Sequence, residues 1–304
     1  MKKPLVVSVL ASSRMNGFTA TLLSNAVDAL FRNGCDVEHI NLYEETIAPC
    51  RGCFCCIRTR EGCIQKDGMG KNGRVYNLLK GANGLIAASP VYHWTYNAAL
   101  HAFLERFYPT HWNGFANGLP FAAITCASNQ GFQTEALRDL CKFGFTVNLR
   151  YIGGVAAHAA LMDKAKKMAF ELGERLSRYA HEDLERGRTW FDETAKWKHY
   201  MSSIWPPFEP YMSNITQGAY DVEHSLPYEV VVSENFGNKE AVNHLRSCVD
   251  NLRKTLATMR LRTREESLNV FLEASLEWTK ATWKELLQKE LGPMPEEYRK
   301  DEKQ

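Results

Sequence analysis

The feature that most constrains the fold is an alternation of short apolar runs with amphipathic segments over about the first 185 residues. Continuous apolar runs occupy residues 4–11, 84–89 and 120–127, and weaker ones occupy residues 36–43 and 148–154. Such runs, bounded by turn residues, are typical of strands that are buried on both faces. Segments with helical periodicity follow at residues 19–34, 96–108, 134–145 and 161–180.

This alternation predicts an α/β fold with a doubly wound, five-stranded parallel sheet, because parallel neighbours need crossover connections. The residues expected to face the sheet are Leu23, Val27, Leu30 and Phe31 in the first helix, and Leu161, Ala165, Met168, Leu172 and Leu176 in the last. Ligands bind such sheets at the carboxyl ends of the strands. The predicted binding loops are therefore residues 12–19, 90–97 and 128–133.

Charge and hydropathy argue against two classes of partner. The chain has 37 Lys plus Arg against 35 Asp plus Glu, a formal charge of +2, so nothing favours nucleic acid or an acidic membrane surface. No apolar run approaches the roughly 18 residues that span a bilayer.

The first apolar run fits a strand better than an export signal, so we expect a cytoplasmic protein. Clustered cysteines in that reducing compartment more often bind metal or react than form disulfides.

The loop after the first strand has the groups of an anion site. Ser12, Ser13 and Thr19 supply hydroxyls, Arg14 supplies a guanidinium, and a starting helix supplies free N–H groups. The loop is glycine-poor, so it matches neither a dinucleotide fingerprint nor a Walker loop. The alternative is a helix start that is simply capped by Ser or Thr.

Five of the nine cysteines lie within residues 50–63. The candidate metal ligands, spaced C-x2-C-x2-C-x6-C, are Cys50, Cys53, Cys56 and Cys63. This compact spacing suits a [4Fe–4S] cluster and lacks the second knuckle of structural zinc sites. Zinc, a redox-active pair of Cys53 with Cys56, or thiols without metal stay as alternatives. Cys55 is a spare, and the isolated cysteines expected in the core are Cys35, Cys126, Cys141 and Cys248.

Three stretches resemble one family in order and spacing. They are LASSRMNGFTATLL, then IAPCRGCFCC with GCIQKDGM downstream, then GLIAASPVYHWTYNAALHAFLERF. Together they are similar to the NADPH-dependent FMN reductase family, and within it to the iron–sulfur flavoproteins. The resemblance covers about residues 1–185 and implies a flavodoxin-like fold with FMN as cofactor.

The resemblance also implies roles for individual residues. It assigns the FMN phosphate to Ser12, Arg14, Phe18, Thr19 and Ala20. It places beside the flavin ring Pro90, Val91, Tyr92 and His93, and at the ring edge Asn129, Gln130 and Gly131. Tyr92 and His93 are the candidate catalytic proton donors, or else they merely pack against the ring. The chain departs from the family at Phe18, where an asparagine is usual, at Gly68, where an aspartate is usual, and in the residues before Arg14.

The implied function is an FMN-dependent oxidoreductase. It would take electrons from NAD(P)H or a reduced carrier and pass them, through the cluster, to a small-molecule or protein acceptor. One alternative is an iron-free, two-electron NAD(P)H reductase of quinones, nitro compounds or other small molecules. Another is a non-enzymatic, flavodoxin-type carrier, against which the modest net charge argues.

Residues 186–304 are predicted to form a separate extension beyond the FMN-binding domain at residues 1–185. Residues 188–214 are aromatic and are broken by prolines, which favours a strap over the core, or a lid over the flavin, rather than one long helix. Residues 238–259 and 263–291 have the apolar stripes of a helical hairpin. Since flavin sites in the resembling family commonly lie at subunit contacts, we expect a homodimer or homotetramer.

Overall fold

The computed structural model describes residues 2–128, 131–192, 195–196, 199–200, 243 and 254. The chain divides into two compact units, with the change of unit after Asp192. All helices and strands bounded below belong to the first unit. The helical hairpin, most of the aromatic segment and Cys248 lie outside the described residues, so the predicted boundary at residue 185 and the extension stay predictions.

Five parallel strands form the sheet, as the sequence predicts. They are β1 (Leu5–Leu10), β2 (Asp36–Asn41), β3 (Gly84–Tyr92), β5 (Pro120–Ala127) and β6 (Arg150–His158), in the order β2-β1-β3-β5-β6. This is the flavodoxin-like strand order. A short strand that the sequence did not predict, β4 (Thr95–Tyr96), pairs antiparallel with the end of β3. All eight residues of β5 are buried, which explains its unbroken apolar run.

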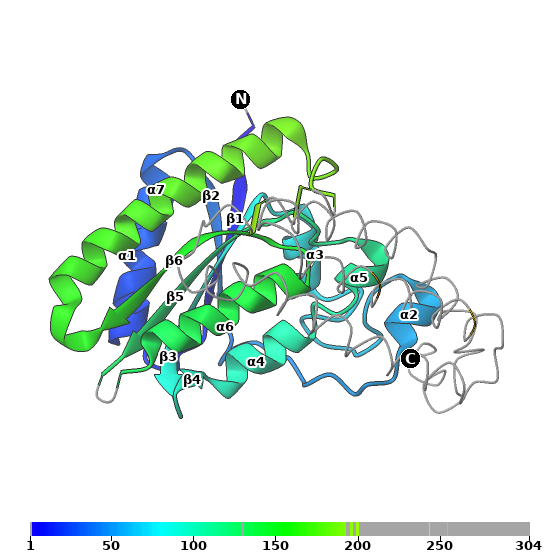
Figure 1. Ribbon diagram of the computed structural model, residues 1–304, viewed down its shortest axis with the longest axis horizontal. Coiled ribbons are helices and arrows are strands. Elements are labelled where there is room, and N and C mark those ends of the chain that lie inside the picture. Colours follow the sequence, from blue (N-terminus) through cyan, green and yellow to red (C-terminus); the bar gives the residue numbers. More distant parts are fainter. Residues whose placement is uncertain are drawn as a thin grey trace. The chain divides into compact units, whose positions relative to one another are not determined.

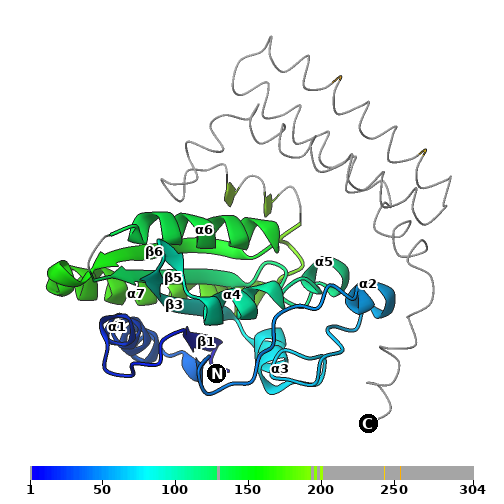
Figure 2. The same cartoon turned by 90° about the horizontal axis from the view of Figure 1, so that it is seen from below.

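Helices cover both faces of the sheet (Figures 1 and 2). α1 (Phe18–Arg32) and α7 (Met162–Arg186) lie side by side on one face, and α3 (Arg74–Gly81), α4 (Ala98–Glu105) and α6 (Gln133–Thr146) cover the other. The shorter pieces are α2 (Cys55–Thr59), α5 (Thr110–Asn113) and the 3-10 turn η1 (Ala159–Leu161). Helix α3 was not predicted. Among the described residues, no helix combines the length and apolarity needed to cross a bilayer.

The face between α1, α7 and the sheet holds a continuous apolar core. Leu23 and Leu30 from α1 meet Leu172 and Leu176 from α7, and all four are buried. The two helices approach closely at Gly173, where an added Cβ would come within 2.2 Å of a backbone oxygen of α1. A glycine is therefore required at this contact.

Three residues predicted for the buried faces are exposed instead. Phe31 is 56% exposed, Leu161 61% and Met168 39%. One residue along a helix turns the side chain by about 100°, so Phe31 and Met168 point away although their neighbours Leu30 and Ala169 are buried. Leu161 lies in η1, before α7 begins, and does not share the face of that helix.

Candidate functional site

A cavity of about 550 Å³ opens at the carboxyl edge of the sheet, beside the ends of β1, β3 and β5. Ser12, Arg14, Phe18 and Thr19 line it from the loop after β1 and the start of α1. Pro90, Val91 and Tyr92 line it from the end of β3. The strand order reverses between β1 and β3, and such a switch point is where open α/β sheets bind ligands. Ser128, at the start of the third predicted loop, lines it as well, so residues from all three predicted loops meet at one cavity.

The first turn of α1 presents unused backbone donors to this cavity. The helix begins after Gly17, which provides no side-chain cap, and its first backbone hydrogen bond runs from Thr21 N to Gly17 O at 2.9 Å. The N–H groups of Phe18, Thr19 and Ala20 therefore have no acceptor within the described part of the chain. The alternative of a Ser- or Thr-capped helix is wrong, because the N-cap is Gly17 and no side chain caps the helix. The Ser12 hydroxyl accepts from Arg14 N, at 3.1 Å.

Electrostatics at this end of the cavity favour an anion. Helix α1 has no acidic residue in its first turn, so the positive end of its dipole is not neutralised. Arg14 is exposed and forms no ion pair with any described residue. Ser12 and Thr19 are buried beside it, at 6% and 4% exposure. A phosphate bound here would meet backbone donors, a hydroxyl and a guanidinium together.

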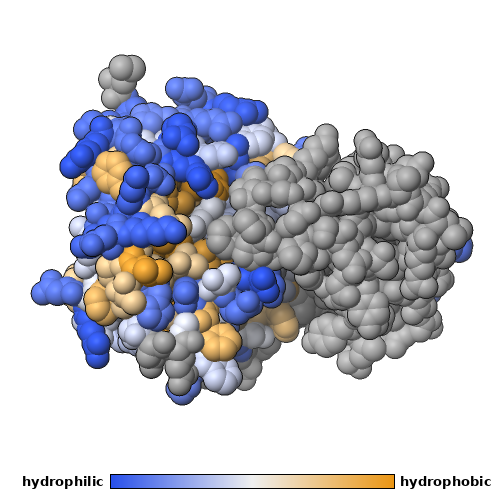
Figure 3. Space-filling model, turned by 60° about the vertical axis from the view of Figure 1, so that its left-hand side comes forward, coloured by the Kyte–Doolittle hydropathy of each residue, from blue (hydrophilic) through white to orange (hydrophobic). Residues whose placement is uncertain are grey.

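Large apolar side chains form part of the cavity rim. Met15, Phe18 and Tyr92 line the cavity although each is about half exposed, at 49%, 51% and 47%. Just beyond Tyr92, Trp94 stacks on Phe132 with 5.2 Å between ring centroids. Apolar side chains also gather among hydrophilic ones on the face shown in Figure 3. An apolar rim next to an anion site suits a ligand with a flat ring system and a phosphate.

The turn after β3 is strained. Val91 pairs with Tyr96 and Tyr92 with Thr95, so His93 and Trp94 form the two-residue turn between β3 and β4. Their φ angles are 48° and 70°, as in a type I′ turn, a conformation that usually takes Asn or Gly. His93 is exposed and does not line the cavity, whereas Tyr92 does. Of the two candidate proton donors, only Tyr92 borders the site.

Of the remaining predicted residues that the structure describes, Ala20 and Gly131 do not line the cavity. Ala20 is buried in α1 behind its exposed first turn. Gly131 has a φ of 85° just before α6, and Asn129 and Gln130 lie outside the described residues. From the end of β5, Cys126 lines the cavity, which the sequence did not predict, beside Ser128 of the predicted loop 128–133.

Asn97 joins the two loops of the cavity and was missed by the sequence analysis. Its Nδ2 donates to the carbonyl oxygen of Ala11 at the end of β1. Its backbone N donates to Ser89 Oγ in β3 at 3.1 Å, and its Oδ1 accepts from Leu100 N at 3.1 Å and so caps α4. An asparagine before a helical segment signals a cap. The bond to Ala11, 86 residues away, leaves no local signal.

The cysteine loop connects β2 to α3 and contains α2. Cys50 is exposed and Cys53, Cys56 and Cys63 are half-buried, and none forms a disulfide. Burial, together with the neighbouring Cys63, Cys53 and Cys50, raises the pKa of the Cys56 thiol to about 12. The four predicted ligands thus lie within electrostatic reach of one another. Free, mutually close thiols are the donor set that iron–sulfur clusters use.

The other cysteines are placed as core residues. Cys35, Cys55, Cys126 and Cys141 are buried. Burial raises the pKa of the Cys55 thiol to about 12, which makes it unreactive. Across the described residues, no three Cys, His, Asp or Glu side chains are arranged to hold a single metal ion. Ligation by the four loop cysteines stays a prediction.

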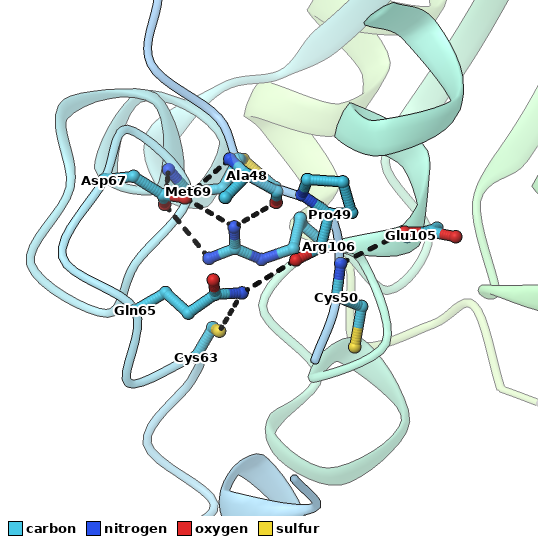
Figure 4. A network of polar contacts seen from close by, with 9 residues as sticks. All are labelled: Ala48, Pro49, Cys50, Cys63, Gln65, Asp67, Met69, Glu105 and Arg106. Atoms are coloured by element: carbon cyan, nitrogen blue, oxygen red, sulfur yellow. Dashed lines mark hydrogen bonds and ion pairs between the residues drawn. The ribbon is translucent and has the colours of Figure 1, made fainter. Parts of the chain in front are cut away.

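A buried ion pair fixes both ends of this loop (Figure 4). Arg106, at the end of α4, donates to the two carboxylate oxygens of Asp67 at 2.6 and 3.0 Å. The side chains are 1% and 5% exposed. Asp67 also accepts from Ala48 N and Met69 N, both at 3.0 Å, and Arg106 donates to Ala48 O at 2.7 Å. Residues on either side of the cysteines are thereby held against α4.

Two further contacts reach the outer cysteines themselves (Figure 4). Glu105 Oε2 accepts from Cys50 N at 3.0 Å. Gln65 Nε2 donates to Pro49 O at 3.1 Å and lies 3.9 Å from Cys63 Sγ. No local signal in the sequence marks Glu105 or Gln65 for these contacts, because Cys50 and Pro49 are distant from them in the chain. Contacts within the protein therefore anchor the loop at Cys50 and Cys63.

Fold and site together define a flavodoxin-like protein with a phosphate-type cavity at the β1/β3 switch point. The sequence profile of the NADPH-dependent FMN reductase family matches residues 4–161, just over half of the chain. The chain belongs to this family.

The chain is also similar to individual relatives and to a solved structure. An iron–sulfur flavoprotein of Archaeoglobus fulgidus is 32% identical over 103 residues, which are 34% of this chain and 45% of that protein. One of Methanocaldococcus jannaschii is 28% identical over 150 residues, 49% of this chain and 75% of that protein. An NAD(P)H:quinone oxidoreductase structure from Methanothermobacter marburgensis has a TM-score of 0.46 at 12% identity, covering 61% of this chain and 98% of its own. The residues that match the Archaeoglobus fulgidus protein make up less than half of the length of that protein.

Proposed function

We propose that this chain binds FMN at the carboxyl edge and acts as an FMN-dependent oxidoreductase that is supplied with electrons by NAD(P)H or a reduced carrier. One observation carries the proposal. The uncapped start of α1, Arg14 and Ser12 border the same cavity as the stretch from Pro90 to Tyr92. Membership of the NADPH-dependent FMN reductase family supports the same cofactor and the same donor.

Different residues of the cavity would bind the phosphate and the ring of FMN. Arg14 and the N–H groups of Phe18, Thr19 and Ala20 would hold the phosphate, and Pro90, Val91 and Tyr92 would flank the ring. The cavity volume, about 550 Å³, lies within the range of small-molecule sites. Bound FMN supplies hydride acceptance and the release of electrons singly or in pairs. Tyr92, which lines the cavity, would donate a proton from its hydroxyl to an acceptor there.

The finer part of the proposal is that Cys50, Cys53, Cys56 and Cys63 hold a [4Fe–4S] cluster that handles single electrons. Three observations support it. The four thiols are free and close enough to affect one another. The ion pair of Arg106 with Asp67 anchors the loop from both sides. Finally, relatives that match this chain are named iron–sulfur flavoproteins.

Anaerobic purification followed by an absorption spectrum and an iron and sulfide assay tests both parts. We expect flavin bands with a broad shoulder and about four irons per chain. Flavin bands without iron would contradict the cluster and support a two-electron, iron-free reductase. Colourless protein that cannot be reconstituted with FMN would contradict the whole proposal. NAD(P)H oxidation with a quinone then tests for an enzyme, since a carrier should turn over almost none without its partner.

A further inference from the structure

A second cavity, of about 320 Å³, lies away from the FMN site, where α7 passes the first residue of β6. Its lining consists of Arg150, Arg175, Arg178, Tyr179 and Glu182. Residues 175, 178, 179 and 182 follow a helical spacing of three and four, so one stripe of α7 forms the wall. Arg150, from the sheet, completes it.

The lining carries a surplus of positive charge. Glu182 is its one carboxylate, and both of its oxygens are engaged: Oε2 with Arg150 Nη1 at 3.0 Å and Oε1 with Arg186 Nη1 at 2.9 Å. Arg175 and Arg178 form no ion pair with any residue that the structure describes. Three guanidinium groups therefore face the cavity against a carboxylate that is already shared.

Arg150 is held rigidly in place. Its side chain is 11% exposed, and its guanidinium lies between two aromatic rings, 4.5 Å from the Tyr179 centroid and 4.4 Å from the Trp190 centroid. Arg186 lies 4.3 Å from the Trp190 ring. The Nε of Arg150 is buried and has no hydrogen-bond acceptor among the described residues. A stacked guanidinium with an unused donor is a pre-organised anion ligand.

The guanidinium of Arg175 lies against strand β6. Its Nη1 lies 3.4 Å from the carbonyl oxygen of Ile152 and would be 2.7 Å from a Cβ placed on Gly153. Gly153 has a φ of 130°, which disfavours any side chain there. The bare backbone at Gly153 thus leaves room for the guanidinium against β6.

We propose that this cavity, lined by Arg150, Arg175 and Arg178, binds the phosphate group of a small phosphorylated molecule. Guanidinium groups match phosphate oxygens in geometry as well as charge, and the volume is at the lower end for a small-molecule site. The ligand is separate from FMN. Arg150 pairs with Pro120 at the amino end of β5, whereas the FMN cavity is reached at Cys126, six residues and about 20 Å further along the strand.

Calorimetric titration of the FMN-loaded protein with inorganic pyrophosphate, at physiological salt, tests the site. Arg178→Gln and Arg175→Gln remove charge without opening the core, and each should weaken pyrophosphate binding by about tenfold or more. Lys167→Gln, an exposed position on the same helix outside the cavity, is the matched control and should change binding less than about twofold. FMN affinity should be the same in all four proteins.

Saturable binding that both arginine variants lose and the lysine variant keeps would support the site. Three results would overturn it: no saturable binding to the wild type, an equal loss in Lys167→Gln, which would indicate unspecific attraction, or competition between pyrophosphate and FMN. The last result would place the anion at Arg14 instead. Since binding is read directly, this test does not depend on electron transfer, and if the chain does not take up FMN the same titration is made on the FMN-free protein.

Discussion

The proposed FMN cavity and the cysteine loop lie on one domain but are built by different means. The cavity takes its donors from regular structure: the start of α1 and the ends of β1 and β3. The cysteine loop, residues 50–63, has little regular structure besides the short helix α2, and side chains from outside it hold it in place. Backbone at the ends of helices and strands is positioned by the fold itself. A loop of this kind depends on a few specific contacts, so single substitutions should disturb the cysteine loop more than they disturb the cavity.

The largest effect is expected at the ion pair that anchors the loop. Arg106→Met leaves the Asp67 carboxylate buried without its partner, which should lower the free energy of unfolding by about 3–5 kcal/mol. Urea unfolding measures the change. Arg138→Met removes a partly exposed arginine paired with the exposed Glu135 at 3.1 Å and should cost less than about 1 kcal/mol. Equal decreases in the free energy of unfolding of the two variants would show that the buried pair stabilises the protein no more than the pair of Arg138 with Glu135.

A smaller effect is expected in the cavity, on binding rather than on stability. Arg14→Ala should weaken FMN binding by about ten- to a hundredfold, because a charge-assisted contact to the phosphate is lost. Quenching of FMN fluorescence measures it. Riboflavin, which has no phosphate, should bind the wild type and the variant alike. If riboflavin binding falls by the same factor, Arg14 acts on the ring or on the fold and the assignment is wrong.

Asn97 connects the parts of the cavity and allows the two contributions to be separated. Asn97→Ala should lower the free energy of unfolding by about 1–2 kcal/mol through loss of the α4 cap. Asn97→Ser keeps a capping oxygen, so its free energy of unfolding should return toward the wild-type value. It cannot make the bond to Ala11, so both variants should bind FMN more weakly than the wild type does. Thermal melts and FMN titration measure the two effects. Full recovery of FMN affinity in the serine variant would exclude a positioning role for the Ala11 bond.

The smallest effect concerns the sheet away from both regions. Burial lowers the pKa of His39, in β2, below its ordinary value of 6.5, and its Nδ1 lies 3.3 Å from Ser8 Oγ. The unfolded chain then binds the proton more readily, so stability present above pH 6.5 is lost as the pH falls from there through the folded-state pKa. Unfolding measured across this window should be less pH-dependent in His39→Gln. An unchanged profile would show that His39 does not contribute.

Much of the fold was predictable because its signals are local. Residues 120–127 form a strand with the bounds that their apolar run indicates, and the loops after the strands meet where parallel topology requires. The antiparallel turn at His93 and Trp94 was missed, because positive φ at two bulky residues contradicts turn preferences. The exposure of Phe31 was missed because helical periodicity leaves residues at the border of a face ambiguous.

By itself, the sequence determined the parallel sheet, the place of its ligand loops and the spacing of the four cysteines, since each depends on residues that are neighbours in the chain. The tertiary structure decided how those parts are held. Asn97 bonds to Ala11 across 86 residues, and Arg106 pairs with Asp67 across 39. Pairs so distant leave no periodicity or motif in the chain, because their energy arises only when folding buries both partners together.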